Sequence, residues 1–127
     1  MTELSPGDLM RHRGPALLVD EIERREASSL ACTASDRGTW PWPRMLEGAA
    51  QTAGLLAGFQ PGGPANGVVA QYRDVVVHAP VATGALRFVA RLDRRLLHFW
   101  RCRFEVTSDG GELLLEGLVT LAPDARA

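Results

Sequence analysis

The sequence predicts an α+β fold in which one apolar helix lies against a curved antiparallel sheet of about six strands. The stretch 43–59 is almost entirely apolar or very small, and it lacks the wide charged face of a surface helix. After it, segments of alternating apolar and polar residues follow one another across short glycine-containing turns. Two further extended segments precede it. A helix this apolar requires a sheet that covers most of its surface.

The helix is expected to begin at Pro43, because a proline in the first turn loses no needed hydrogen bond. It is expected to end near Phe59, since the following Gln-Pro-Gly-Gly-Pro cannot continue a helix. A glycine inside a helix costs roughly 0.5–1 kcal/mol relative to alanine. The three glycines inside the helix, Gly48, Gly54 and Gly58, therefore indicate that another element approaches it closely there.

Six segments are expected to be strands, at 16–23, 28–35, 67–78, 86–92, 98–106 and 113–121. The stretches between them, including 24–27, 36–40, 82–84 and 109–111, are expected to be turns or breaks. The clearest alternation is in 98–106, where His98 shares the apolar face with Trp100 and Phe104. His98 is thus expected to be a core residue.

The composition limits the possible functions. A chain of 127 residues is one domain, residues 1–127, and a net charge of -1 gives no electrostatic footprint for nucleic acid. The first residues lack the pattern of a signal peptide, and no apolar run is long enough to span a membrane, so a cytoplasmic location is expected. Cys32 and Cys102 are expected to be buried thiols, and no histidine or cysteine has metal-ligand spacing. No metal or cofactor is predicted.

Glu47 is the carboxylate of the apolar helix. Burying an ionised carboxylate costs several kcal/mol unless it is neutralised, hydrogen-bonded or open to a pocket. Its place near the helix start favours the ionised form. Gln51 lies one turn later on the same face. Glu47 is therefore predicted to face a ligand channel; the alternative is a helix-start carboxylate bonded to a loop. Gln51 would either hold Glu47 in place or form a hydrogen bond across a dimer.

Three segments resemble one family. Residues 11–20, Arg-His-Arg-Gly-Pro-Ala-Leu-Leu-Val-Asp, are similar to its opening motif, and 45–54, Met-Leu-Glu-Gly-Ala-Ala-Gln-Thr-Ala-Gly, to its helix motif. Residues 72–80, Tyr-Arg-Asp-Val-Val-Val-His-Ala-Pro, with Gly84, are similar to the strand and turn after the helix. The chain resembles the hotdog-fold FabA/FabZ-like 3-hydroxyacyl-acyl-carrier-protein dehydratases, most closely those of aryl polyene pathways.

The resemblance implies a homodimer joined edge to edge by its sheets, with an acyl tunnel between the two helices. It implies a thioester substrate on acyl carrier protein or coenzyme A in fatty-acid or polyketide-type biosynthesis. In the family a helix carboxylate works with a histidine from the partner's His-Phe-Pro-Gly segment. Here no histidine lies between Ser35 and Glu47, and Trp42 stands in the place of that glycine.

The candidate catalytic residues are Glu47, Gln51 and His78, and the candidate substrate-binding residues are Trp40, Trp42, Pro43 and Tyr72. Free backbone N–H groups at the helix start can polarise a thioester carbonyl. His78 ends a strand near the implied tunnel mouth, and its alternative role is structural. His12 most resembles a structural residue. The two tryptophans either pack or line the acyl pocket.

The sequence also fits two other functions, a thioesterase and a non-catalytic subunit. Hotdog thioesterases also use a helix carboxylate without a histidine, and a non-catalytic subunit would pair with an active homologue in a heterodimer. The arginines are either a solvated face or a docking patch for an acidic carrier protein or coenzyme A phosphates, in particular Arg91, Arg94, Arg95, Arg101 and Arg103.

Overall fold

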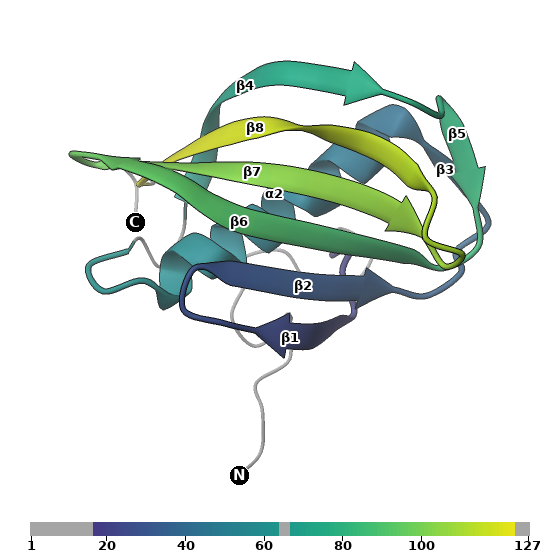
Figure 1. Ribbon diagram of the computed structural model, residues 1–127, viewed down its shortest axis with the longest axis horizontal. Coiled ribbons are helices and arrows are strands. Elements are labelled where there is room, and N and C mark those ends of the chain that lie inside the picture. Colours follow the sequence, from purple (N-terminus) through teal and green to yellow (C-terminus); the bar gives the residue numbers. More distant parts are fainter. Residues whose placement is uncertain (1–16, 64–66, 124–127) are drawn as a thin grey trace, which may run out of the picture.

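The computed structural model describes residues 17–63 and 67–123, and in these ranges one helix packs against one face of a curved six-stranded antiparallel sheet (Figure 1). The expected fold class is therefore confirmed. The sheet has the order β1-β2-β6-β7-β8-β4. Its strands are β1 (Glu21–Arg25), β2 (Ser29–Ala34), β6 (Leu86–Leu96), β7 (Phe99–Ser108), β8 (Leu113–Pro123) and β4 (Gly67–Val77). Two short strands, β3 (Thr39–Pro41) and β5 (Val81–Thr83), form a separate ribbon.

The helix α2 (Trp42–Phe59) packs on the inner face of the sheet, and ten of its residues are buried. Two aromatic rings fill this layer, Phe88 of β6 and Phe104 of β7. A Cβ added at Gly48 would lie 2.6 Å from the Phe88 ring, and one added at Gly117 of β8 would lie 2.9 Å from Phe104. Glycine at position 48 is thus required by the ring that touches the helix there, as the sequence predicted.

The first strand begins later than expected. Leu18 and Val19 are buried, yet they precede β1, which starts at Glu21. The Leu18 N–H donates to Gln51 Oε1 on α2 at 2.8 Å, and the Asp20 N–H donates to the Thr33 carbonyl of β2 at 2.9 Å. The helix and the sheet therefore both hold this segment. Arg24 and Arg25, expected in a turn, belong to β1 because an exposed edge strand needs no apolar alternation.

The ribbon of β3 and β5 occupies two stretches that the sequence predicted to be turns or breaks. Trp40 is paired with Ala82, and each strand has three residues, which is too short for a periodic pattern to show. Directly after the ribbon, the Trp42 N–H donates to the Pro80 carbonyl at 2.8 Å. The ribbon therefore fixes where the helix starts.

The segment before β1 is attached to the β2–β3 connection by Asp20. Its carboxylate accepts hydrogen bonds from the Ser35 N–H at 2.7 Å and the Ser35 hydroxyl at 2.9 Å, and it pairs with Arg37. Arg37 also donates to the Leu17 carbonyl at 2.7 Å. Burial by itself would raise the pKa of Asp20, but the bonds from Ser35 and Arg37 outweigh it and hold that pKa below its usual value.

Replacing Asp20 by asparagine is expected to lower the free energy of unfolding by about 1–2 kcal/mol at pH 7, because a partly exposed charged acceptor is lost. The pKa of Asp20 is lower in the folded protein than in the unfolded one, where it is about 3.9. The charged side chain therefore stabilises the fold above about pH 3.9. This stabilisation disappears as the pH falls through the pKa of the folded state. Urea unfolding at pH 7 and near pH 3 checks this: the difference between the two proteins should be large at pH 7 and small at pH 3. An equal difference at both pH values would contradict it.

Both cysteines are buried free thiols, as expected. Burial raises the pKa of Cys32 and of Cys102 to about 12 in each case, so neither forms a thiolate near neutral pH. No described helix is long and apolar enough to cross a membrane.

Candidate functional site

Glu47 lies in the second turn of α2, and its side chain is exposed in the single chain. The sequence predicted that this carboxylate faces a ligand channel, and in the single chain it is uncovered. The reason is that α2 is not covered on all sides: Gly54 is only half-buried and Gly58 is exposed, seven and eleven residues after Glu47. A Cβ added at Gly54 would meet no atom of the described residues within 4 Å. Glu47, Gly54 and Gly58 share one helix face, here called the open stripe.

The structure places Glu47 within electrostatic range of Tyr72 of β4. Tyr72 pairs with Val119, whose side chain belongs to the core, so its ring lies on the helix side of the sheet, where it is half-buried. Burial raises the pKa of Tyr72, and the negative charge of Glu47 raises it further. The Tyr72 hydroxyl therefore stays protonated near neutral pH and can donate a hydrogen bond beside the carboxylate.

The start of α2 has almost no protein caps. Pro41 precedes the helix without a side-chain cap, and the first turn contains no acidic residue. Of the four N–H groups that a helix start leaves without intrahelical partners, two are absent because positions 41 and 43 are prolines. The third, of Trp42, is bonded to Pro80. The fourth belongs to Arg44, three residues before Glu47.

The two tryptophans beside the helix start have different environments. Trp40 is fully buried and packs against Phe88 with ring centroids 5.9 Å apart. Its Nε1 has no hydrogen-bond acceptor among the described residues, and the Arg44 guanidinium lies 5.2 Å from its ring centroid. Trp42 is 39% exposed. Packing is thus the role of Trp40, whereas Trp42 is available at the surface near Glu47.

Gln51 is buried, and its Oε1 accepts the hydrogen bond from the Leu18 N–H. It therefore ties the segment before β1 to the helix, one turn beyond Glu47. Gln51 belongs to the framework around Glu47, and the structure supplies no reason to give it a proton-transfer role.

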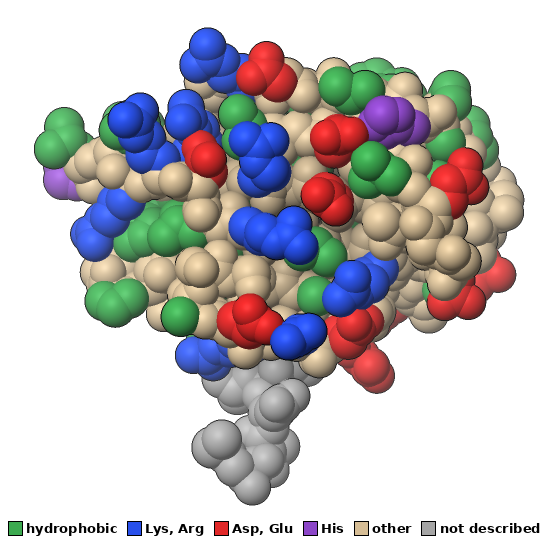
Figure 2. All heavy atoms as spheres, in the orientation of Figure 1, with side chains coloured by type: hydrophobic (Ala, Val, Ile, Leu, Met, Phe, Trp, Pro, Cys, Tyr) green, Lys and Arg blue, Asp and Glu red, His purple; other side chains and the backbone are tan. Residues whose placement is uncertain are grey.

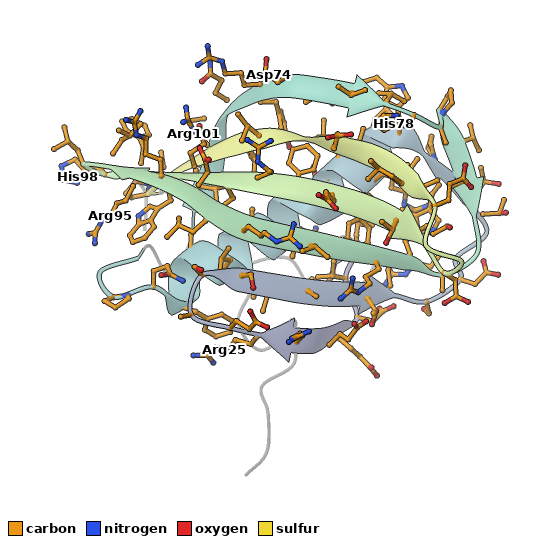
Figure 3. All side chains as sticks on the ribbon, in the orientation of Figure 1. Arg25, Asp74, His78, Arg95, His98 and Arg101 are labelled. Atoms are coloured by element: carbon orange, nitrogen blue, oxygen red, sulfur yellow. The ribbon has the colours of Figure 1, made fainter. Side chains whose placement is uncertain are left out.

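The histidines do not come together with Glu47 in this chain. His78 Nε2 lies 2.7 Å from Glu116 Oε2, and Glu116 is next to the core residue Leu115 on β8, so it points to the sheet face away from the helix. Figure 3 shows His78 on that face and His98 at the far end of the β6–β7 hairpin. His98 is exposed in the turn, so its predicted place on an apolar strand face is wrong. His12 lies outside the described residues.

Strand β4, which carries Tyr72, is an edge of the sheet. The edge and the neighbouring ribbon expose four valines, Val69, Val76, Val77 and Val81, each between 37% and 55% accessible. Its register shifts at a bulge that contains Asp74 with a φ of 54°. In the described part of the chain, this edge has the exposed apolar side chains and backbone to which another strand can pair.

Comparison with solved structures agrees with this architecture. A chain of the dehydratase heterocomplex ApeI:P from Xenorhabdus doucetiae superposes with a TM-score of 0.83 at 17% identity, covering 98% of this chain and 94% of that one. This chain has the hotdog fold. A hypothetical thioesterase with coenzyme A from Streptococcus pneumoniae superposes with a TM-score of 0.65 at 14% identity, covering 80% and 83% of the two chains. Zebra fish thioesterase superfamily member 2 gives 0.69 at 13% identity, covering 82% and 80%.

No protein-family model and no curated protein matches the chain. Hotdog proteins of both dehydratase and thioesterase type are thus its structural neighbours. Among the described residues, no group of three histidine, cysteine, aspartate or glutamate side chains is arranged to hold a metal ion.

Proposed function

We propose that this hotdog protein is a dehydratase-like subunit for a 3-hydroxyacyl thioester in fatty-acid or polyketide-type biosynthesis, with Glu47 as its acid/base group. The observation that supports this most is the exposed Glu47 carboxylate, within electrostatic range of Tyr72 on the edge strand β4. A second subunit paired along β4 would enclose Glu47 and turn the open stripe of α2 into a wall of an acyl channel.

In this proposal the start of α2 holds the thioester carbonyl. The Arg44 N–H is the donor that an incoming oxygen meets, and the positive end of the helix stabilises the negative charge that develops on it. Glu47 removes the proton from the carbon next to the carbonyl. The bond from the neighbouring carbon to its hydroxyl then breaks, a double bond forms, and the hydroxyl leaves as water with a proton from protonated Glu47 or from a second acid. Tyr72 and Trp42 would contact the substrate.

A mixed dimer is favoured because a second acid, which would protonate the leaving hydroxyl, has to come from outside this chain's Glu47 site. The described histidines, His78 and His98, lie away from Glu47 of their own chain. The ApeI:P structure is itself of a heterocomplex. A homologous partner subunit that carries a histidine toward Glu47 would complete the site, with this chain supplying the carboxylate. The alternative arrangement is a homodimer in which Glu47 alone serves as both base and acid.

A thioesterase is the second candidate. It is favoured by one specific observation, the absence of histidine between Ser35 and Glu47, because hydrolysis needs a carboxylate to activate water or attack the carbonyl rather than an acid–base pair. The thioesterases among the structural neighbours fit this alternative.

Incubation of the purified protein with a 3-hydroxyacyl thioester and with the matching enoyl thioester separates these functions. Interconversion of the two without release of thiol supports the dehydratase. Release of free thiol supports the thioesterase instead. If the protein alone does neither, addition of a histidine-containing homologue should restore dehydration and give a mixed dimer by native mass measurement. No reaction in any of these mixtures would make it a non-catalytic subunit.

A further inference from the structure

The β6–β7 hairpin ends in an exposed apolar apex, here called the hairpin tip and made of Leu96, Leu97 and Phe99. Their exposed fractions are 42%, 88% and 43% respectively. The hairpin tip projects beyond its neighbours, because strand pairing of β2 with β6 ends at Arg91 and that of β8 with β7 ends at Trp100. Figure 2 shows hydrophobic side chains, with basic ones behind them, at the end of the molecule where Figure 1 places this hairpin.

Leu97 occupies a turn position that normally belongs to glycine. It is the first residue of a two-residue turn between the paired Leu96 and Phe99, and its φ is 52°. A positive φ at this position of a hairpin favours glycine or asparagine, because the Cβ of other residues crowds the backbone. Leu97 thus combines an unfavourable backbone conformation with an 88% exposed isobutyl group. Such a side chain stabilises the protein only when an apolar environment covers it.

Arginines lie behind the apolar apex on both faces of the hairpin. Leu96 is paired with Phe99, and the next pair back on the same face is Arg94 with Arg101. At about 3.3 Å per residue, the arginine pair stands about 7 Å behind the apolar pair. Arg95 lies on the opposite face, since its cross-strand partner belongs to the core. Basic side chains therefore form a collar behind the hairpin tip.

The positive charge of this collar is only partly neutralised. Residues 94–104 hold four arginines and no acidic residue. Arg101 pairs with Asp93 at 2.7 Å, whereas Arg94 forms no ion pair with the described residues. Arg95 lies over an aromatic ring, 4.4 Å from its centroid, which leaves the charge of the guanidinium in place. The hairpin tip is therefore an apolar point with free positive charge behind it.

The opposite end of β6 and β7 is acidic. An open hollow of about 530 Å³ there is bordered by four carboxylates and one arginine: Asp20, Glu21, Glu23, Asp109 and Arg87. A molecule charged in this way turns its basic end toward an anionic surface and its acidic end away from it. The charge distribution thus orients the protein with its hairpin tip forward.

We propose that the hairpin tip inserts into a lipid bilayer with anionic headgroups. Leu96, Leu97 and Phe99 would enter the boundary between headgroups and acyl chains, where apolar faces of interfacial segments lie about 5–10 Å deep. The spacing of about 7 Å then leaves Arg94 at the level of the phosphates, and Arg95 reaches them by extending its side chain. This contact is peripheral, and it is independent of the proposed enzymatic function.

The shape of the hairpin tip favours lipid over a protein partner. A specific protein interface buries about 800 Å² on each side and requires a complementary surface. A two-residue turn and the pair next to it form a narrow point instead. A bilayer accepts such a point without a matching shape, because its interfacial region is fluid.

Sedimentation of the purified full chain with vesicles tests this proposal. Vesicles of phosphatidylglycerol mixed with phosphatidylcholine should bind the protein, and pure phosphatidylcholine should bind it about tenfold more weakly. Leu97→Asn is expected to lower the partition coefficient about tenfold, because asparagine fits the turn but has no apolar side chain to bury. Its unfolding midpoint should stay the same or rise. Arg94→Gln should lower binding about fivefold, and only with the anionic vesicles.

Two control variants change the same properties elsewhere. Arg24→Gln removes an equal charge from β1, and Val76→Thr removes exposed apolar surface from β4. Neither should change vesicle binding.

A fluorescent label distinguishes insertion from adsorption. Cys32 and Cys102 are buried, so an environment-sensitive maleimide labels only an introduced thiol. A label on Leu97→Cys should emit at shorter wavelength and become protected from iodide when anionic vesicles are added. A label on Val76→Cys should show neither change.

Three results would overturn the proposal. The first is no binding to either vesicle, or equal binding by all variants. The second is binding that Arg94→Gln weakens and Leu97→Asn does not, with an unshifted label, because charge alone would then hold the protein. The third is that both variants weaken binding to an acidic carrier protein and leave vesicle binding unchanged, which would make the hairpin tip a protein contact. Vesicle binding is measured without substrate, so its outcome is separate from that of the activity assays.

Discussion

Replacing Glu47 by glutamine is expected to lower the turnover of a 3-hydroxyacyl thioester by about 10²–10⁴-fold, because the general acid/base group is removed while its shape is kept. The fold should be unaffected. Glu47 is exposed in the single chain, so its substitution neither opens a cavity nor leaves a buried partner unpaired. Steady-state kinetics of dehydration, with urea unfolding on the same samples, measures both quantities. A second subunit, if the chain needs one, is supplied in excess.

Glu116→Gln is the matched control for this substitution. Glu116 is also a partly exposed carboxylate, but it pairs with His78 on the sheet face away from α2. It should therefore leave turnover unchanged. If Glu47→Gln retains full activity, Glu47 is not the acid/base group. If Glu116→Gln is the variant that loses activity, the site lies around His78 on the opposite face.

The fold could be predicted from the sequence because its main features are large and repeated. The apolar character of 42–59 extends over five turns, and β7 alternates buried and exposed residues over most of its ten positions. Such patterns follow from burial of one face and do not depend on a single contact. The short ribbon of β3 and β5 could not be predicted, since three residues carry no period and the pairing is between segments distant in sequence.

The candidate site was predicted less completely. A carboxylate in an apolar helix signals an unusual environment, and that signal identified Glu47. The sequence predicted that Glu47 faces a ligand channel, but it did not show how much of the helix the chain itself leaves uncovered. The open stripe and the valines of β4 instead leave an apolar face uncovered in the single chain. Sequence patterns report that a side chain is to be buried, but not by which molecule.

The interior glycines of α2 should respond in opposite directions to the same substitution. Gly48→Ala is expected to lower the free energy of unfolding by about 1–3 kcal/mol, since the added methyl would overlap the immobile ring of Phe88. Gly54→Ala is expected to raise it by about 0.5–1 kcal/mol, because no atom in the described part of the chain lies within 4 Å of the new Cβ and alanine favours the helix. Urea unfolding of the two variants at low protein concentration measures this difference.

The same pair of variants tests whether the open stripe is used. Gly54→Ala adds a methyl group to the helix face between Glu47 and Gly58, where the proposed acyl arm or the second subunit would lie. If the stripe is a channel wall, this more stable protein should have a higher KM for the long carrier-bound substrate or a weaker dimer. If Gly54→Ala raises stability and leaves substrate binding and assembly unchanged, the stripe faces only water. Should Gly48→Ala prove as stable as the natural chain, Phe88 does not hold the helix at that position, and the helix start would need another anchor than the sheet.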